Sequence, residues 1–277
     1  TAEMKRIFSL LILISSVSVA QYSDETFYLS PSVFYTSGNY STKVKSNSIA
    51  FYNTLQLFNE FFLINNYENL KIEGSDYDYI QHAFLAGGVL DLFPYYLKFN
   101  YAHYKGEYSY KPYEFSYNDF SNLYNLEFLY YVDWYYLGAA YSHLNQVGFV
   151  NTSSHQVTLR LEKILSNKFF ISVKPNLTIV KNDRTLFSVY SKLHYAPITN
   201  LIFKVGGFAG ERIFYFDNDL LIIFNQNYIQ KYQIFGQVEY LPLDLIKLSV
   251  GYQHNKFTDF TVDYFYAGVK ANFYISK

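Results

Sequence analysis

The chain of 277 residues contains no cysteine, which excludes disulfides, lipid attachment at a cysteine, thiolate metal ligands and cysteine nucleophiles. Charged residues make up only 16% of the chain, against roughly 25% in ordinary soluble domains. The formal net charge is −1, which gives no basic footprint for nucleic acid. We therefore expect neither a nucleic-acid partner nor a cofactor, and stability must come from the backbone hydrogen-bond ladder.

Long apolar runs are also missing, except for one at the N-terminus. Lys5 and Arg6 precede the run IFSLLILISSVSV, and the small residues Ser18-Val19-Ala20 follow. A basic start, a short apolar run and small residues are typical of a secretory signal peptide, and the run is too short to span a bilayer comfortably. We predict that residues 1–20 are a signal peptide with an artefactual leader, and that residues 21–277 form one domain.

Aromatic residues are, in contrast, abundant. They form 22% of the chain, with 32 tyrosines. Because tyrosine has an apolar ring and a polar hydroxyl, it suits a boundary between hydrocarbon and water. Several Tyr and Trp residues flank tight turns, as an interfacial girdle would. The residues expected in this girdle are Tyr95, Tyr96, Tyr130, Trp134, Tyr135, Tyr195, Tyr240 and Tyr274.

Hydrophobic residues recur at every second position along most of the chain, as in FFISVKPNLTIV from Phe169 to Val180. This period is that of a β-strand. Pro175 lies inside that strand and has no N–H to donate, so we predict a bulge or locally broken pairing there. The period predicts fourteen strands, at 27–37, 48–58, 61–72, 78–91, 95–107, 119–132, 134–145, 155–165, 168–181, 185–196, 199–212, 229–241, 245–255 and 261–275.

Two kinds of connection alternate between these strands: tight turns such as Asn59-Glu60, and longer polar segments such as Lys105 to Asp119. Over its mature length the chain thus resembles bacterial outer-membrane β-barrel proteins. The resemblance implies an all-β, up-and-down antiparallel transmembrane barrel of about 14 strands, with 12 or 16 possible, and with short turns and both termini in the periplasm. It also implies an outer-membrane location, contact with membrane lipid and a lipopolysaccharide-type outer leaflet, and a barrel-assembly machinery during biogenesis. The oligomeric state stays open.

The two faces of the expected strands differ in charge. One face carries no Asp, Glu, Lys or Arg over sets such as Leu126–Phe128–Tyr130, which suits lipid. A soluble sandwich would give the same alternation, so the signal peptide and the aromatic content decide for a barrel. The opposite face would line the lumen, and its basic residues outnumber its acidic ones eight to three. The expected lumen-lining charges are Lys98, Glu127, Arg160, Glu162, Lys174, Lys192, Lys204, Arg212, Glu239, Lys247 and Lys270.

Such a lumen predicts a passive channel for small polar or anionic solutes, because fixed positive charge raises the local concentration of anions. The same charges could instead neutralise one another as salt bridges between strands. A structural or surface-interaction barrel with a closed lumen is the alternative, with outer loops such as Lys105 to Asp119 binding a partner. The segment from Phe214 to Tyr228, which is unusually apolar at residues 220–224, could fold inward as a constriction or extend two strands outward.

Catalytic and metal-binding patterns are weak. No two of the six histidines have metal-ligand spacing. Ser142-His143 and Ser153-Ser154-His155 resemble nucleophile–base pairs. Neighbouring residues on a strand point to opposite faces, which argues against the first pair, and the second is expected in a loop with no evident Asp or Asn to orient the histidine. The glycines of VGGFAG, from Val205 to Gly210, lack the context of a phosphate loop and favour strand curvature. We expect no enzyme activity and no metal site.

Overall fold

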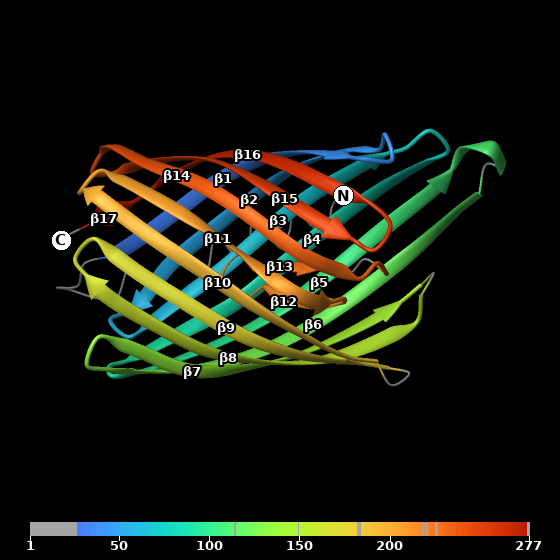
Figure 1. The fold of residues 1–277 in the computed structure, drawn as a ribbon. Coiled ribbons are helices and arrows are strands. Elements are labelled where there is room, and N and C mark those ends of the chain that lie inside the picture. The colour runs from blue at the N-terminus through green and yellow to red at the C-terminus, as the bar shows by residue number, and fades with distance from the viewer. Residues whose placement is uncertain are drawn as a thin grey trace.

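The computed structural model describes residues 27–113, 115–148, 150–181, 184–217, 219, 221–224 and 227–275. The segment assigned to a signal peptide lies outside them. Fourteen long strands form a closed antiparallel barrel, which confirms the expected fold class (Figure 1). These strands are β1 Phe27–Tyr40, β2 Lys45–Phe58, β3 Phe61–Glu73, β4 Tyr77–Leu92, β5 Tyr95–Tyr110, β6 Phe115–Val132, β7 Tyr135–Val147, β8 Thr152–Ser166, β9 Phe169–Val180, β10 Arg184–Ile198, β11 Leu201–Arg212, β14 Gln230–Leu243, β15 Ile246–Phe257 and β16 Thr261–Ala271.

The strand order is up-and-down, because each wall strand pairs with its neighbours in sequence. β1 closes the barrel by pairing with β2 on one side and with β16 on the other. The short β17 Phe273–Ile275 continues β16 and also pairs with β1, so that Phe27 lies opposite Ile275. Both ends of the described chain therefore lie at one end of the barrel. In the part of the chain that the structure describes, no helix is long and apolar enough to cross a membrane.

Pro175 and Pro31 each interrupt the ladder on one side only and without a shift of register. Between β8 and β9 the pairs on either side of Pro175 keep the same register, but Pro175 itself has no partner on β8, although it pairs with Val189 on β10. The predicted break at Pro175 is thus confirmed as lost pairing rather than as a bulge. Pro31 of β1 has the same effect at the closing seam, where pairing lapses between Ser32–Lys270 and Leu29–Phe273. This lapse splits the expected strand 261–275 into β16 and β17.

The turns at the end that holds Phe27 and Ile275 are short, as expected. Asp133 and Trp134 both have positive φ, 45° and 71°, which is the geometry of a two-residue hairpin that follows the strand twist. At the other end the expectation of long polar loops is wrong for Lys105 to Asp119. β5 runs to Tyr110, β6 starts at Phe115, and the 3-10 turn Lys111–Tyr113 lies between them. Backbone pairing thus continues through a segment whose polarity suggested a loop.

The inner and outer faces of the wall have opposite character. Outward side chains such as Val157, Phe187 and Val250 are apolar and exposed, whereas inward ones such as Gln156, Asn176 and Glu239 are polar and buried. Toward the end away from Phe27 the inner face also becomes apolar, at Leu85, Leu123 and Leu144 among others. A chain segment inside the barrel covers this apolar area.

That segment is the connection between β11 and β14, which folds inward. It contains a small hairpin of β12 Tyr215–Asp217 and β13 Ile222–Phe224. Figure 1 shows these two strands within the outline of the barrel, and the contacts of β12 with β8 place the pair in its interior. We call the described residues 213–217, 219 and 221–224 the lumen hairpin. Of the two courses that the sequence allowed for this segment, the structure has the inward one.

Candidate functional site

Gly210 directs the chain from the wall into the lumen. It has φ +114°, a conformation that favours glycine, and the pairing of β11 with β14 shifts register between Ala209 and Arg212. A Cβ at Gly210 would lie 2.4 Å from the carbonyl oxygen of Phe187. The glycine-rich segment is therefore part of a strand, as the sequence predicted, and it ends in a bulge that the sequence did not predict.

Arg212, expected as a lumen-lining charge, is enclosed at the base of the lumen hairpin and only 2% exposed. Its guanidinium lies 3.4 Å from the ring centre of Phe208 and 3.8 Å from that of Tyr215. It also donates hydrogen bonds to the side-chain oxygens of Gln230, at 2.9 Å, and Gln233, at 2.6 Å. Arg212 thus anchors the hairpin by stacking between a wall residue and a hairpin residue.

Backbone groups of the lumen hairpin are bound by polar side chains of β8. Ser154 Oγ donates to the carbonyl of Phe214 at 2.6 Å. Gln156 both donates to the carbonyl of Phe216, at 3.0 Å, and accepts from its N–H, at 2.9 Å. These bonds satisfy hairpin groups that would otherwise be buried without partners. The apolar side chains of the hairpin pack on the apolar inner wall; this cluster comprises Ala83, Leu85, Ala102, Tyr104, Leu123, Leu144, Val180, Leu186, Ile213, Phe214, Phe216 and Leu221.

Asp219, between the two hairpin strands, is bound by three cations from three neighbouring wall strands. Arg160 of β8 approaches Oδ1 at 3.3 Å, and Lys174 of β9 forms an ion pair with the same oxygen. Lys192 of β10 donates to Oδ2 at 2.7 Å. All four side chains are between 7% and 15% exposed, so solvent screens these interactions only weakly. We call Arg160, Lys174 and Lys192 the basic triad.

Two wall carboxylates hold the basic triad in position. Glu127 of β6 forms an ion pair with Arg160 and is 1% exposed. Glu162 of β8 accepts from Arg160 at 2.6 Å and from Ser172 at 2.9 Å, and lies 3.7 Å from Lys174. With Asp219, three carboxylates face the three cations of the triad, so the formal charges of these six groups cancel. Without Asp219 one positive charge remains.

The positive charges also determine the ionisation of Asp219, which belongs to the connection and not to a membrane-spanning strand. Burial alone would raise its pKa, but Lys174, Lys192 and Arg160 together hold the pKa of Asp219 well below its usual range. Asp219 is therefore a carboxylate at any physiological pH.

A second charged group lies elsewhere on the inner wall, where Glu239 of β14 pairs with Lys204 of β11 at 2.6 Å and with Lys247 of β15 at 3.1 Å. Lys98 lies opposite Glu127 in the β5–β6 register, and Lys270 lies opposite Lys247 in the β15–β16 register. The structure therefore brings Lys98, Glu127, Arg160, Glu162, Lys174 and Lys192 to one side of the lumen. It places Lys204, Glu239, Lys247 and Lys270 in another part.

A small cavity lies between the lumen hairpin and this wall. It has a volume of about 20 Å³ and lies beside Lys174, lined also by Thr158, Tyr190 and Tyr215 among others. That volume holds roughly one water molecule.

The expected girdle residues lie at or beside the short turns. Tyr95 stacks on Tyr130 with ring centres 5.1 Å apart, Lys163 donates to the hydroxyl of Tyr135 at 2.5 Å, and Trp134 is exposed. Tyr96 packs on Tyr136, Tyr195 on Phe169 and Tyr274 on Tyr28, while Tyr240 is exposed on β14.

A second belt lies nearer the opposite end, where the sequence placed several histidines near outer strand ends as an interfacial ring. There Tyr67 bonds His82 at 2.9 Å, and Tyr141 bonds His155 at 2.7 Å. Asp263 accepts from Tyr252 at 2.6 Å and lies 2.7 Å from His254. The signal was present in the sequence, because the histidines fall near outer strand ends beside tyrosine-rich segments.

Neither Ser142 nor Ser154 binds the histidine next to it in the sequence, and the second pattern lies in β8 rather than in the expected loop. Ser142 points inward and donates to Asn125 at 2.8 Å, while Ser154 binds Phe214. His155 faces outward to Tyr141, and its ring lies 4.6 Å from that of His143. Within the described ranges, no three His, Asp or Glu side chains gather in an arrangement that could hold a metal ion.

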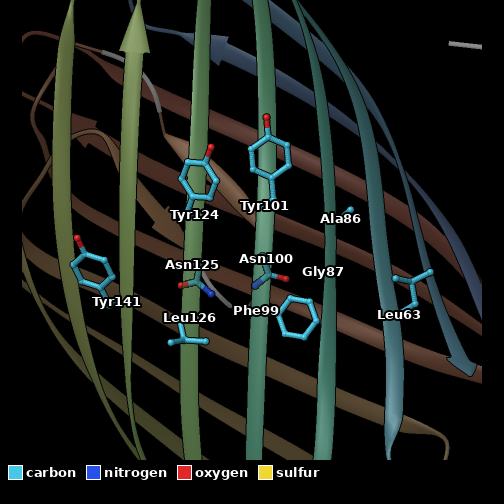
Figure 2. A pocket seen from close by; sticks show the side chains of 10 residues that line it. All are labelled: Leu63, Ala86, Gly87, Phe99, Asn100, Tyr101, Tyr124, Asn125, Leu126 and Tyr141. Atoms are coloured by element: carbon cyan, nitrogen blue, oxygen red, sulfur yellow. The ribbon is translucent and has the colours of Figure 1, made fainter. Parts of the chain in front are cut away.

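A hollow of about 470 Å³ lies on the wall between β3 and β7, where Ala86 offers little side-chain volume (Figure 2). Outward aromatic and aliphatic side chains surround it, among them Phe99, Tyr101 and Tyr124. Asn100 and Asn125, which lie opposite each other on β5 and β6, also line it. This hollow is almost entirely apolar, in contrast to the charged site in the lumen.

A scan against protein-family models and a search of curated proteins found no match. Among solved structures, the CymD monoaromatic hydrocarbon channel is similar with a TM-score of 0.62 and 7% identity, over 92% of this chain and 90% of that one. The toluene transporters TodX of Pseudomonas putida and TbuX of Ralstonia pickettii each give a TM-score of 0.57 at 9% identity, covering 92% and 91% of this chain and 90% of their own. The chain therefore has the fold of bacterial outer-membrane β-barrels.

Proposed function

We propose that the protein is an outer-membrane channel for small polar or anionic solutes, in which the lumen hairpin is the movable constriction. The observation that carries this proposal is that β12 and β13 form a sheet of their own, separate from the barrel ladder. The hairpin can therefore leave its place without breaking a wall strand. Its withdrawal would separate Asp219 from the basic triad and expose those cations to the lumen.

The outer-membrane location is supported by three features of the chain. The N-terminal pattern is that of a secretory signal peptide. The outer wall is apolar and bears aromatic residues at the turn end, as the interface of a membrane barrel requires. The fold is shared with outer-membrane barrels. Cleavage of residues 1–20 belongs to this proposal.

The solute preference follows from the charges on the inner face, although ion pairing reduces the excess of basic over acidic charge that the sequence predicted. Lys204 and Lys247 share one carboxylate, Glu239, so this pair of cations keeps a formal charge of +1. Fixed positive charge beside the path raises the local anion concentration without any chemistry.

The proposal is tested by the conductance of the refolded protein in a planar bilayer under a KCl gradient. We expect discrete conductance steps with a reversal potential toward that of chloride. Lys204→Glu and Lys247→Glu should each shift this potential toward that of potassium, whereas Lys231→Glu, which changes charge beside Glu211 outside the lumen, should not. A folded barrel that never conducts, even with the hairpin shortened, would leave the structural barrel with a closed lumen as the better account.

A second candidate is a channel for small apolar solutes, favoured by the apolar inner wall at Leu85, Leu123 and Leu144. The similar structures include a monoaromatic hydrocarbon channel and two toluene transporters. Uptake by proteoliposomes separates the two candidates. Faster entry of gluconate than into protein-free vesicles supports the first, and faster entry of toluene alone supports the second.

A further inference from the structure

The Asp219 carboxylate makes contacts that a free solute carboxylate could make equally well. Its two oxygens are bound by different members of the basic triad, Oδ1 by Arg160 and Lys174 and Oδ2 by Lys192. Three cations from three adjacent wall strands thus converge on one small planar anion. Such charge-assisted hydrogen bonds are the usual means by which proteins bind carboxylates and phosphates.

We propose that the basic triad is a binding site for a small carboxylate, and that the hairpin's own Asp219 occupies this site in the state described here. This inference rests on the proposed function for its role in transport. A solute carboxylate would compete with Asp219, and by displacing it would release the tip of the lumen hairpin. The solute class that the channel admits would then be the class that opens it.

The wall preorganises this site independently of the hairpin. Glu127 and Glu162 fix the guanidinium of Arg160, and Ser172 in turn fixes Glu162. The three cations are on strands whose backbone is held by the barrel ladder, although pairing between β8 and β9 lapses beside Lys174. The site should therefore persist when Asp219 leaves, with one uncompensated positive charge to attract an anion.

Competition follows from shared donors, because Asp219 already engages Arg160, Lys174 and Lys192. The cavity of about 20 Å³ beside Lys174 is too small for acetate. Binding of the solute and docking of the hairpin therefore exclude each other, and each weakens the other by the same factor. A tethered carboxylate has an effective concentration in the millimolar range, so a free carboxylate should compete in that range.

Ser154 offers a probe for hairpin release in a chain that has no cysteine of its own. It is 2% exposed, and its hydroxyl binds the carbonyl of Phe214 under the hairpin. In Ser154→Cys, a small change in volume, the thiol should react with a soluble maleimide only when the hairpin lifts. The labelling rate of the refolded, full-length barrel is then measured against sodium acetate, with sodium chloride at equal ionic strength as the control.

We expect acetate at millimolar concentration to raise the labelling rate several-fold and chloride to leave it unchanged. Combining Asp219→Asn with Ser154→Cys should make labelling fast even without acetate. In calorimetry, Asp219→Asn should bind acetate about tenfold more tightly than the parent, because the competitor is gone. Lys192→Gln in the Asp219→Asn background should abolish that binding, whereas Lys231→Gln, which removes a charge outside the site, should retain it.

The inference is overturned if acetate neither accelerates labelling nor binds to Asp219→Asn. The proposed ligand class is wrong if inorganic phosphate competes with Asp219 and acetate does not. Competition by acetate, alone or together with phosphate, supports it. The two proposals fail separately. Acetate binding without any conductance would refute the channel and keep the site, and anion conductance without an acetate effect would keep the channel and refute the site.

Discussion

The Oδ2 atom of Asp219 lies 2.7 Å from the Nζ atom of Lys192, and this contact joins the connection between β11 and β14 to the barrel wall at β10. The two residues belong to different parts of the fold, because the lumen hairpin does not share the barrel ladder. The position of the hairpin therefore depends on side-chain contacts, of which Asp219 makes the most highly charged. Substitutions at these contacts should therefore change hairpin docking, whereas substitutions in the wall should change the stability of the barrel.

Hairpin docking should be insensitive to pH across the physiological range. The pKa of Asp219 is held well below its usual value of 3.8 by the basic triad when the hairpin is docked. Because docking lowers the pKa of Asp219, its ionised form fully stabilises the docked hairpin at pH values above the pKa of the undocked state. This stabilisation is lost as the pH falls through the pKa of the docked state. Conductance should thus stay constant from about pH 8 to about pH 5 and rise only in stronger acid. A steep rise centred near pH 6 would contradict this assignment, and Asp219→Asn should remove any rise in acid.

Arg212→Lys should release the hairpin although it keeps the positive charge. Lysine cannot stack a planar group between Phe208 and Tyr215 or reach both Gln230 and Gln233. We expect a loss of about 1–3 kcal/mol of docking free energy. The measurement is the maleimide labelling rate of Cys introduced at Ser154. Arg184→Lys, at the exposed start of β10, is the matched control and should label as slowly as the parent.

Val250→Arg should destabilise the barrel in a bilayer. Val250 faces outward and is 57% exposed, midway along β15 between the belt at His254 and the turn before Ile246. A cation at the lipid midplane costs about 2–4 kcal/mol, and about 0–1 kcal/mol near the interface. Leu245→Arg, at the turn, is therefore the control. Urea unfolding in lipid vesicles checks the difference, and equal costs at both positions would argue against a membrane-facing wall.

Pro175→Val should stabilise the barrel. Pro175 pairs with Val189 on β10 but leaves the β8 side unpaired, so valine would supply the missing donor for β8. One added ladder hydrogen bond contributes about 1 kcal/mol. Urea unfolding in vesicles and amide exchange at position 175 measure it. Loss of conductance without a gain in stability would instead indicate that the gap at Pro175 serves the channel.

The sequence predicted the barrel well because a hydrophobic period of two, sustained over long segments, is produced by β-strands and by almost nothing else. It placed the break at Pro175 because a proline inside a strand always removes a donor. The same physical effect occurs at Pro31, whose lost pairing divides the last strand at Asn272. The loop expected at Lys105 to Asp119 was wrong because polar residues can pair as strands when neighbouring strands extend with them.

The site was harder to predict than the fold. The alternation of side chains between two faces identifies inward residues only where the chain is a regular strand. It therefore located Lys174 and Lys192 but gave no information about Asp219, which lies in a connection. It also counted Arg212 with the lumen charges, although aromatic rings enclose it. The course of the hairpin follows from an apolar inner wall at Leu85 and Leu123, and that patch exists only once the strands are assembled.

The most direct test of the account is the single-channel conductance of the parent protein and of Asp219→Asn, measured side by side in a planar bilayer under a KCl gradient. The account predicts a larger open fraction and a stronger chloride preference in Asp219→Asn, because the triad loses its internal partner and the hairpin its strongest ionic contact. Asp259→Asn, in the exposed turn between β15 and β16, should behave like the parent. Identical conductance and selectivity in Asp219→Asn and the parent would contradict the account.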